Sequence, residues 1–257
     1  MKKYNYRLLF KELVKSYYED VFEEKVEEIL EKKEIDKDSF AKIVSSLCGV
    51  EVEYSKDFSL DLKRAIENYK SSNKVVISSN LCNMDCVKVN GKTLCQNACP
   101  FDAIILNGDK SSINIDECID CGICVDVCDS NNFIDKIEFM PLFKILGEHH
   151  KVIAAVAPSI VGQFGDNVTV GQLRAGLKAL GFADMVEVAF FADMLTIKES
   201  AEFNRHIQES SDFVLSSCCC PIWVAMIKKQ HRDLIKHITP SVSPMIAAGR
   251  VIKKIYP

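Results

Sequence analysis

The cysteines are the feature that most constrains what this chain can be. Eight of its twelve cysteines lie between Cys82 and Cys128, three are consecutive at Cys218–Cys220, and Cys48 stands alone. The N-terminal apolar stretch is only Leu8-Leu9-Phe10 before charge returns, so no signal peptide is indicated. Thiols stay reduced in the cytosol, so clustered cysteines favour metal binding over disulfides. We therefore expect a cytoplasmic, metal-binding protein.

The second half of the cysteine cluster has a recognisable spacing. Four thiols follow the pattern Cys-x2-Cys-x2-Cys-x3-Cys, namely Cys118, Cys121, Cys124 and Cys128. This spacing is typical of bacterial two-cluster ferredoxins, where three of the thiolates bind one cubane. Four cysteines that were merely buried in a core would have no reason to share this spacing. Zinc is the serious alternative, although zinc ligand pairs are usually separated by a longer loop.

The first half of the cluster is less regular. Its cysteines are Cys82, Cys86, Cys95 and Cys99, and Pro100 follows the last one as in ferredoxins. An Asn90-Gly91 hairpin can absorb the insertion before Cys95. The crossover rule of two-cluster ferredoxins assigns Cys82, Cys86, Cys95 and Cys128 to one 4Fe-4S cluster and Cys99, Cys118, Cys121 and Cys124 to the other. The spacing of the first four cysteines is irregular, and Asp129 stands where a proline usually follows the last cysteine. A three-iron cluster in place of the first 4Fe-4S cluster is therefore left open.

Three regions are expected along the chain. Residues 1–74 show apolar stripes among Glu and Lys and predict a helical module, with one helix capped near Asp38 and ended near Gly49, and another over Leu60 to Tyr69. Cys48 lies on an apolar face and is interpreted as a buried small hydrophobe. Residues 75–140 form the cluster-binding region, and residues 141–257 form the third.

The third region alternates strand and helix patterns. Apolar strands are predicted at Val152–Val156, Met185–Phe190 and Phe213–Ser216, with helices at Val170–Leu180, Ala192–Gln208 and after Pro221. Strands separated by helices predict a parallel sheet, whose ligands bind at the carboxyl ends of the strands. Pro158 and the three-cysteine run both fall there.

Some partners are not favoured by the composition. The formal net charge is −4 and the sequence pI is about 5.8, so neither nucleic acid nor anionic lipid is attracted. The longest nearly apolar stretch, Val152 to Val161, is far shorter than the roughly 20 residues of a membrane helix.

Three segments after Val152 resemble the opening half of the catalytic domain of iron-only (FeFe) hydrogenases. The first is Ala157-Pro158-Ser159, and the second is a helix with Ala192-Asp193 followed by Glu199 and Glu202. The third is Ser217-Cys218-Cys219-Cys220-Pro221-Ile222-Trp223, followed by Thr239 and Ser243-Pro244-Met245. Taken alone, the first could be an ordinary strand-to-loop proline and the second a solvated helix face.

The resemblance implies roles for these residues. Cys219 would pass protons along Glu199, Thr239 and Glu202, and Cys220 would ligate the cubane of the active cluster. Ala157, Pro158 and Ser159 would contact a cyanide ligand of the two-iron subsite. The implied reaction is the reversible combination of two protons and two electrons to dihydrogen under anaerobic conditions. Cys218 replaces a serine and adds a thiol beside the site.

The resemblance also defines the expected architecture. The fold class is α/β plus small α+β, with an N-terminal helical module, a dicluster ferredoxin-like domain and a partial parallel α/β hydrogenase domain. The family's other cubane ligands lie in Met-Pro-Cys-x2-Lys and Cys-x3-Cys segments, which these 257 residues do not contain. We therefore expect a truncated hydrogenase that is inactive alone and exchanges electrons with ferredoxin or another electron-transfer protein. The alternatives are an electron-transfer or redox-sensing protein, and a split hydrogenase whose second chain supplies the missing half.

Overall fold

The computed structural model describes residues 6–32, 36–70, 75–82, 85–108, 110–148, 151–209 and 214–256. The chain divides into two compact units, unit 1 over Met1–Lys144 and unit 2 over Ile145–Pro257. Each unit is described below by itself.

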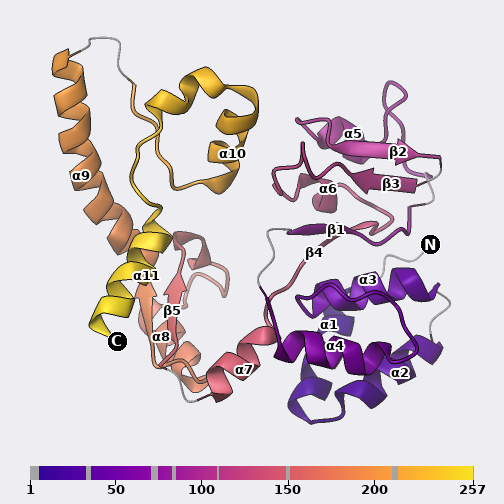
Figure 1. Cartoon of the computed structure of the whole chain (residues 1–257). Coiled ribbons are helices and arrows are strands. Elements are labelled where there is room, and N and C mark those ends of the chain that lie inside the picture. Colours follow the sequence, from indigo (N-terminus) through magenta and orange to yellow (C-terminus); the bar gives the residue numbers. More distant parts are fainter. Residues whose placement is uncertain are drawn as a thin grey trace. The chain divides into compact units, whose positions relative to one another are not determined.

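Unit 1 begins with four helices, whereas the apolar stripes predict three, because two helices stand where one was expected before Asp38. They are α1 (Tyr6–Tyr18), α2 (Phe22–Lys32), α3 (Lys37–Leu47) and α4 (Phe58–Glu67) (Figure 1). The carboxylate of Asp36 caps α3 by accepting a hydrogen bond from Ser39 N–H at 2.9 Å, so the predicted cap near Asp38 was two residues too late. Gly49, with a φ of +76°, follows the end of α3 where the sequence placed it.

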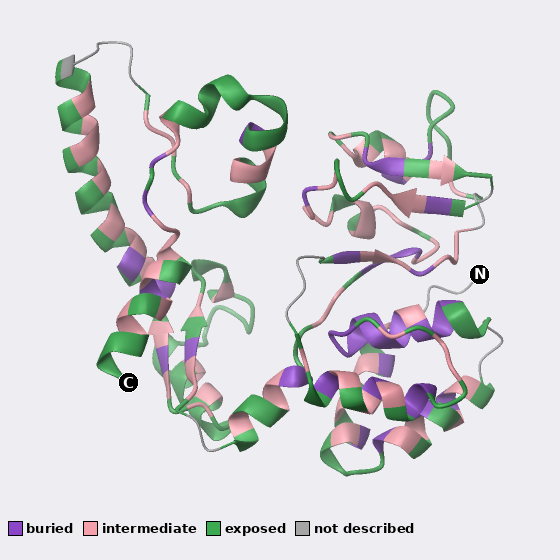
Figure 2. Ribbon diagram, in the orientation of Figure 1, coloured by how far each residue is buried: buried purple, intermediate pink, exposed green. Residues whose placement is uncertain are grey.

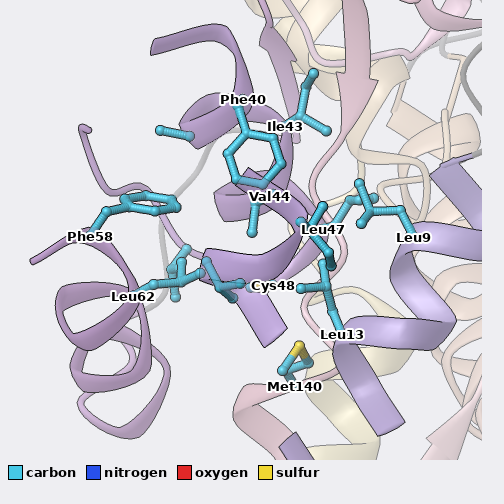
Figure 3. Close-up of a cluster of buried hydrophobic side chains, with 14 of the residues drawn as sticks. Leu9, Leu13, Phe40, Ile43, Val44, Leu47, Cys48, Phe58, Leu62 and Met140 are labelled. Atoms are coloured by element: carbon cyan, nitrogen blue, oxygen red, sulfur yellow. The ribbon is translucent and has the colours of Figure 1, made fainter. Parts of the chain in front are cut away.

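The largest core of unit 1 is formed by these helices. Figure 3 shows Leu13, Val44 and Leu62 within one cluster of buried side chains, and Cys48 lies among them with no exposed surface. Met140 reaches the same cluster from beyond the cysteine-rich region, and Ile134 also belongs to it. The N-terminal helices and the cysteine-rich region therefore share a hydrophobic core, and the predicted boundary at residue 74 stays a prediction.

The cysteine-rich region contains short strands and short helices. Its elements are β1 (Val76–Ser78), α5 (Leu94–Ala98), β2 (Ile104–Asn107), β3 (Lys110–Ile113), α6 (Ile123–Asp126) and β4 (Phe133–Asp135), and α7 (Pro141–Gly147) crosses into unit 2. Strands β1 and β4 pair antiparallel, and so do β2 and β3. The predicted hairpin is present, because Val89 and Lys92 exchange backbone hydrogen bonds around Asn90 and Gly91, both at positive φ.

Unit 2 is built on one parallel strand pair. Its elements are β5 (Ile153–Val156), the 3-10 helix η1 (Pro158–Ile160), α8 (Val170–Ala179), β6 (Asp184–Glu187), α9 (Val188–Glu209), α10 (Pro221–Gln230), η2 (Arg232–His237) and α11 (Pro244–Ile255). Strands β5 and β6 are parallel, with Ile153 opposite Asp184. The chain is thus a mixed helix-and-sheet protein with small two-stranded sheets.

Two strand predictions in unit 2 need correction. Val188 to Phe190 were predicted to end a strand but begin α9, because apolar β-branched and aromatic residues fit either element in a short run. The third predicted strand begins at Phe213, which lies outside the described residues, and Ser216 makes only an isolated parallel bridge to Ile238.

The two units differ in burial. Figure 2 shows buried segments concentrated in the helices and strands of unit 1, whereas α9 and α10 are mostly exposed or half-buried. Phe190, Met194 and Ile197 on α9 are each at least half exposed. Within the described part of the chain, no helix is long and apolar enough to cross a membrane.

Candidate metal centres

One pocket of unit 1 gathers four thiols from two parts of the sequence. Cys99, Cys118, Cys121 and Cys124 all line it, and the remaining lining is mainly apolar. Asp120 and Gly122 have positive φ angles of 55° and 78°, so the loop between Cys118 and Cys124 winds tightly. This winding lets three closely spaced thiols face one space, and Cys99 joins them from the first half of the cysteine cluster.

A second pocket gathers the other four thiols. It is lined by Cys82, Cys86, Cys95 and Cys128, together with Thr93, Ser111 and Phe133. A capping box of Thr93 and Gln96 begins α5 and so positions Cys95. The grouping of the eight thiols into two sets of four, with Cys99 and Cys128 exchanged, is the grouping that the crossover rule predicts.

Hydrogen bonds reach several of these sulfurs. The backbone N–H groups of Ala103, Asp120 and Asn132 donate to Cys99, Cys118 and Cys128 Sγ at 3.4, 3.4 and 3.2 Å. Donors of this kind stabilise thiolate charge and tune the potential of a bound centre. Each pocket therefore contains at least one cysteine sulfur that already accepts a backbone hydrogen bond, which would stabilise its negative charge as a thiolate.

The buried side chain of Asn132 ties the second pocket to the strands. Its amide donates to Ser111 Oγ at 3.0 Å, and its Oδ1 accepts from Cys82 N–H at 3.2 Å. Sequence analysis missed this residue, because an asparagine in a loop carries no motif. Its position four residues after Cys128 is the only sequence signal that could have found it.

In each set, neighbouring thiols raise the pKa of at least one cysteine. Burial raises the pKa of the Cys124 thiol to about 12, and the neighbouring Cys118 and Cys121 raise it further. Burial also raises the pKa of Cys95, with smaller contributions from Cys128 and Cys82. Metal binding requires thiolates, so occupation of either pocket releases protons from these groups.

The spacing of the ligands bears on the type of metal centre. In the part of the chain that the structure describes, no three His, Cys, Asp or Glu side chains are close enough to hold a single metal ion. A zinc ion needs its sulfur ligands about 2.3 Å away. In a cubane the thiolates bind separate irons and stand farther apart.

The three predicted cyanide-contact residues lie together after β5 in unit 2. Ala157 and Pro158 line an apolar pocket at the carboxyl ends of β5 and β6, whereas Ser159 is not among its lining residues. Glu187 is the one charged residue of that lining, which otherwise includes Met185 and Phe164. The pocket lies where ligands bind in parallel sheets.

The structure brings together part of the predicted proton path. Thr239 is buried, and its hydroxyl donates to Glu202 Oε2 at 3.5 Å. Cys219 and Cys220 are exposed. Cys220 caps α10, where its sulfur accepts from Trp223 N–H at 3.5 Å.

Cys218 lies within the electrostatic influence of a predicted carboxylate, Glu199. Its thiol donates to the Ser241 carbonyl at 2.9 Å and is half-buried. Burial raises the pKa of Cys218, and the negative charge of Glu199 raises it further. The sequence marked this thiol as additional, but only the folded arrangement places it beside Glu199.

Comparisons with known proteins find relatives among the iron hydrogenases. Residues 150–257 match the family described as iron only hydrogenase large subunit, C-terminal domain. The chain is 32% identical to iron hydrogenase 1 of Clostridium pasteurianum over 114 residues, which are 41% of this chain and 20% of the relative. It is 25% identical to the NADP-reducing hydrogenase subunit HndD of Solidesulfovibrio fructosivorans over 170 residues, which are 61% of this chain and 29% of the relative.

The matches cover only part of these relatives, since the chain spans between about a fifth and three tenths of their length. The family match over residues 150–257 nevertheless includes the Ala157-Pro158-Ser159 loop, the Glu199–Glu202 helix and the three-cysteine run. The chain is therefore related to the iron-only hydrogenases.

Proposed function

We propose that unit 1 holds two 4Fe-4S clusters and passes electrons to or from a hydrogenase-type unit 2. The observation that carries this proposal is the gathering of eight cysteines into two pockets of four. The first cluster would be held by Cys82, Cys86, Cys95 and Cys128. The second would be held by Cys99, Cys118, Cys121 and Cys124.

The pockets fit such clusters chemically. All four donors of each pocket are sulfur, which is the usual ligand set of 4Fe-4S clusters. N–H groups donate to Cys99, Cys118 and Cys128, and apolar side chains such as Phe133 and Ile119 surround the thiols. When bound, a cluster supplies one-electron storage and transfer without bond chemistry of its own.

In unit 2 we propose the hydrogenase roles that the resemblance implies. Cys220 would ligate a cubane linked to a two-iron subsite, and Ala157, Pro158 and Ser159 would lie against that subsite. Protons would move between Cys219, Glu199, Thr239 and Glu202. The hydrogen bond from Thr239 to Glu202 supports one link of this path. The whole enzyme would interconvert protons, electrons and dihydrogen.

An electron-transfer function without hydrogen chemistry is the second candidate. The observation that favours it is that unit 1 offers two complete sets of four thiols, whereas unit 2 contains only Cys218, Cys219 and Cys220. In a split hydrogenase another chain would add the remaining ligands. One relative is by name a subunit of an NADP-reducing hydrogenase, and we propose that this chain also works with a separate electron-transfer protein, in the cytoplasm where thiols stay reduced.

The test of the cluster proposal is anaerobic reconstitution with iron and sulfide. We expect about eight irons and eight sulfides per chain, and a reduced-state resonance spectrum with coupling between two centres. Cys48→Ala is the matched control, because Cys48 is buried in the helical core and should not affect the iron count. Tightly bound zinc with almost no iron would contradict the proposal.

A further inference from the structure

A groove of unit 1 lies next to one of the four-thiol pockets. It has a volume of about 540 Å³ and is lined by the segment that follows α3 and by residues of β1 and β3. Val52, Ile77 and Ile113 are among its apolar lining residues. In Figure 1, β1 lies between α3 and the β2–β3 hairpin, which is where this groove runs. The groove is not one of the sites assigned above.

Cys118 connects the groove with the pocket of Cys99, Cys118, Cys121 and Cys124. It lines both spaces, and so do Val76, Ile113 and Asp120. A molecule lying in the groove would contact the Cys118 side chain and so reach the edge of the four-thiol pocket. The groove is therefore a place on unit 1 where a partner could approach that pocket closely.

The groove is acidic. Its lining contains three carboxylates, Glu51, Glu53 and Asp120, against the single cation Lys42. Asp116 and Glu117 are exposed just before Cys118 and add to the charge at this end. No Lys or Arg occurs from Ser111 to Asp135. Lys136 also lies beside Glu51, and its side chain, which is 3% exposed, pairs with Glu138 as well.

We propose that this groove docks a small one-electron carrier protein through a basic face. The inference rests on the proposed function, because it needs the adjacent pocket to hold a cluster. Like charges repel at such short range, so a carrier with an acidic face would be disfavoured. The apolar floor supplies contact area, and the carboxylates orient the partner and speed its approach.

Binding to ferricytochrome c, a carrier with a lysine-rich face, tests the proposal. Titration calorimetry on the reconstituted chain at low ionic strength should show a complex that weakens as salt is added. The double substitution Glu51→Gln with Glu53→Gln should weaken binding about 3- to 10-fold. Since Glu51 also pairs with the buried Lys136, Glu53→Gln alone is measured too and should shift binding in the same direction.

The matched control removes the same charge elsewhere on unit 1. Glu24 and Glu31 are exposed on α2 and do not line the groove, so changing both to Gln should alter the affinity less than twofold. Carbodiimide cross-linking should join cytochrome c lysines to Glu51, Glu53, Asp116 or Glu117. Equal losses in the two double variants, or cross-links confined to other acids, would overturn the proposal.

Two further measurements separate this inference from the cluster proposal. Iron and sulfide are counted on every sample, so a chain that binds cytochrome c but holds no iron refutes the clusters and, with them, an electron-carrier role for the groove. Tighter low-salt binding of flavodoxin, an acidic carrier, would refute the basic partner even if eight irons are present. Reduction of ferricytochrome c by the reduced chain should slow in the Glu51/Glu53 variant and keep its rate in the control.

Discussion

Cys48 differs from the other cysteines in its surroundings. It is fully buried among Leu13, Val44 and Leu62, and burial raises the pKa of its thiol strongly. Cys48→Ser should therefore destabilise unit 1 by about 1–3 kcal/mol, because a hydroxyl loses more hydration than a thiol on burial. Urea unfolding followed by circular dichroism measures the loss. Reconstituted iron content should not change, and a halved iron content would show that Cys48 is a ligand.

The exchange of Cys99 and Cys128 between the two cysteine sets gives a second prediction. Cys124→Ser and Cys99→Ser should remove the same spectroscopic component of the reduced chain. Cys95→Ser and Cys128→Ser should remove the other one, because each pair lines one pocket. The expected loss is about four irons in each variant. If Cys99→Ser matched Cys95→Ser instead, the crossover would be wrong.

At the scale of elements, the turn after α3 depends on a glycine. Gly49 has a φ of +76°, and a Cβ there would lie 2.7 Å from Ile137 O and 2.8 Å from Glu138 Cα. Backbone atoms cannot move aside as a flexible side chain does. Gly49→Ala should therefore cost at least about 1–3 kcal/mol of unfolding free energy.

Gly108→Ala is the control for this substitution. Gly108 also has a positive φ, +62°, but a Cβ at this position would have no other atom within 4 Å. The variant should lose only the cost of the backbone conformation, about 1 kcal/mol. Equal losses in the two variants, measured by the same urea unfolding, would show that the contact with residues 137–138 carries no energy.

The elements that sequence predicted best are those with a repeated pattern or a special turn. Apolar stripes predicted the helices of unit 1, and Asn90-Gly91 predicted the hairpin that precedes Cys95. The run from Met185 to Phe191 was harder, since every residue in it except Glu187 is apolar, and a short continuous apolar run fits a strand as well as a helix. Its change from β6 to α9 at Val188 depends on packing that a local pattern does not contain.

Sequence likewise predicted one part of the candidate sites and not another. Ligand spacing predicted which cysteines group together, because cluster geometry limits the number of residues between ligands. It could not predict that Asn132 accepts a hydrogen bond from Cys82 N–H or that the charge of Glu199 acts on Cys218, since these interactions join residues 50 and 19 positions apart. Contacts of this kind follow from the fold as a whole.

At the scale of the whole molecule, the two units are unequally equipped for metal binding. Unit 1 gathers two sets of four thiols, whereas the three cysteines of unit 2 are adjacent in sequence. Neighbouring residues direct their side chains apart, so Cys218, Cys219 and Cys220 cannot each bind a separate iron of one cubane. The 257-residue polypeptide should therefore neither evolve nor oxidise hydrogen, even after treatment with a synthetic two-iron precursor. Gas chromatography with reduced methyl viologen as electron donor measures this.

Adding the missing ligands should reverse that result. Co-expression with a chain that carries Met-Pro-Cys-x2-Lys and Cys-x3-Cys segments should restore hydrogen evolution, because four thiolates could then hold the cubane of unit 2. In the restored complex, Cys219→Ala should lower turnover at least about 100-fold by removing the first proton carrier. If Cys218→Ala is the more damaging change, the thiol beside Glu199 is the carrier instead. Hydrogen evolution by the 257-residue polypeptide alone that survives Cys220→Ala would refute both the ligand role of Cys220 and the need for a second set of cysteines.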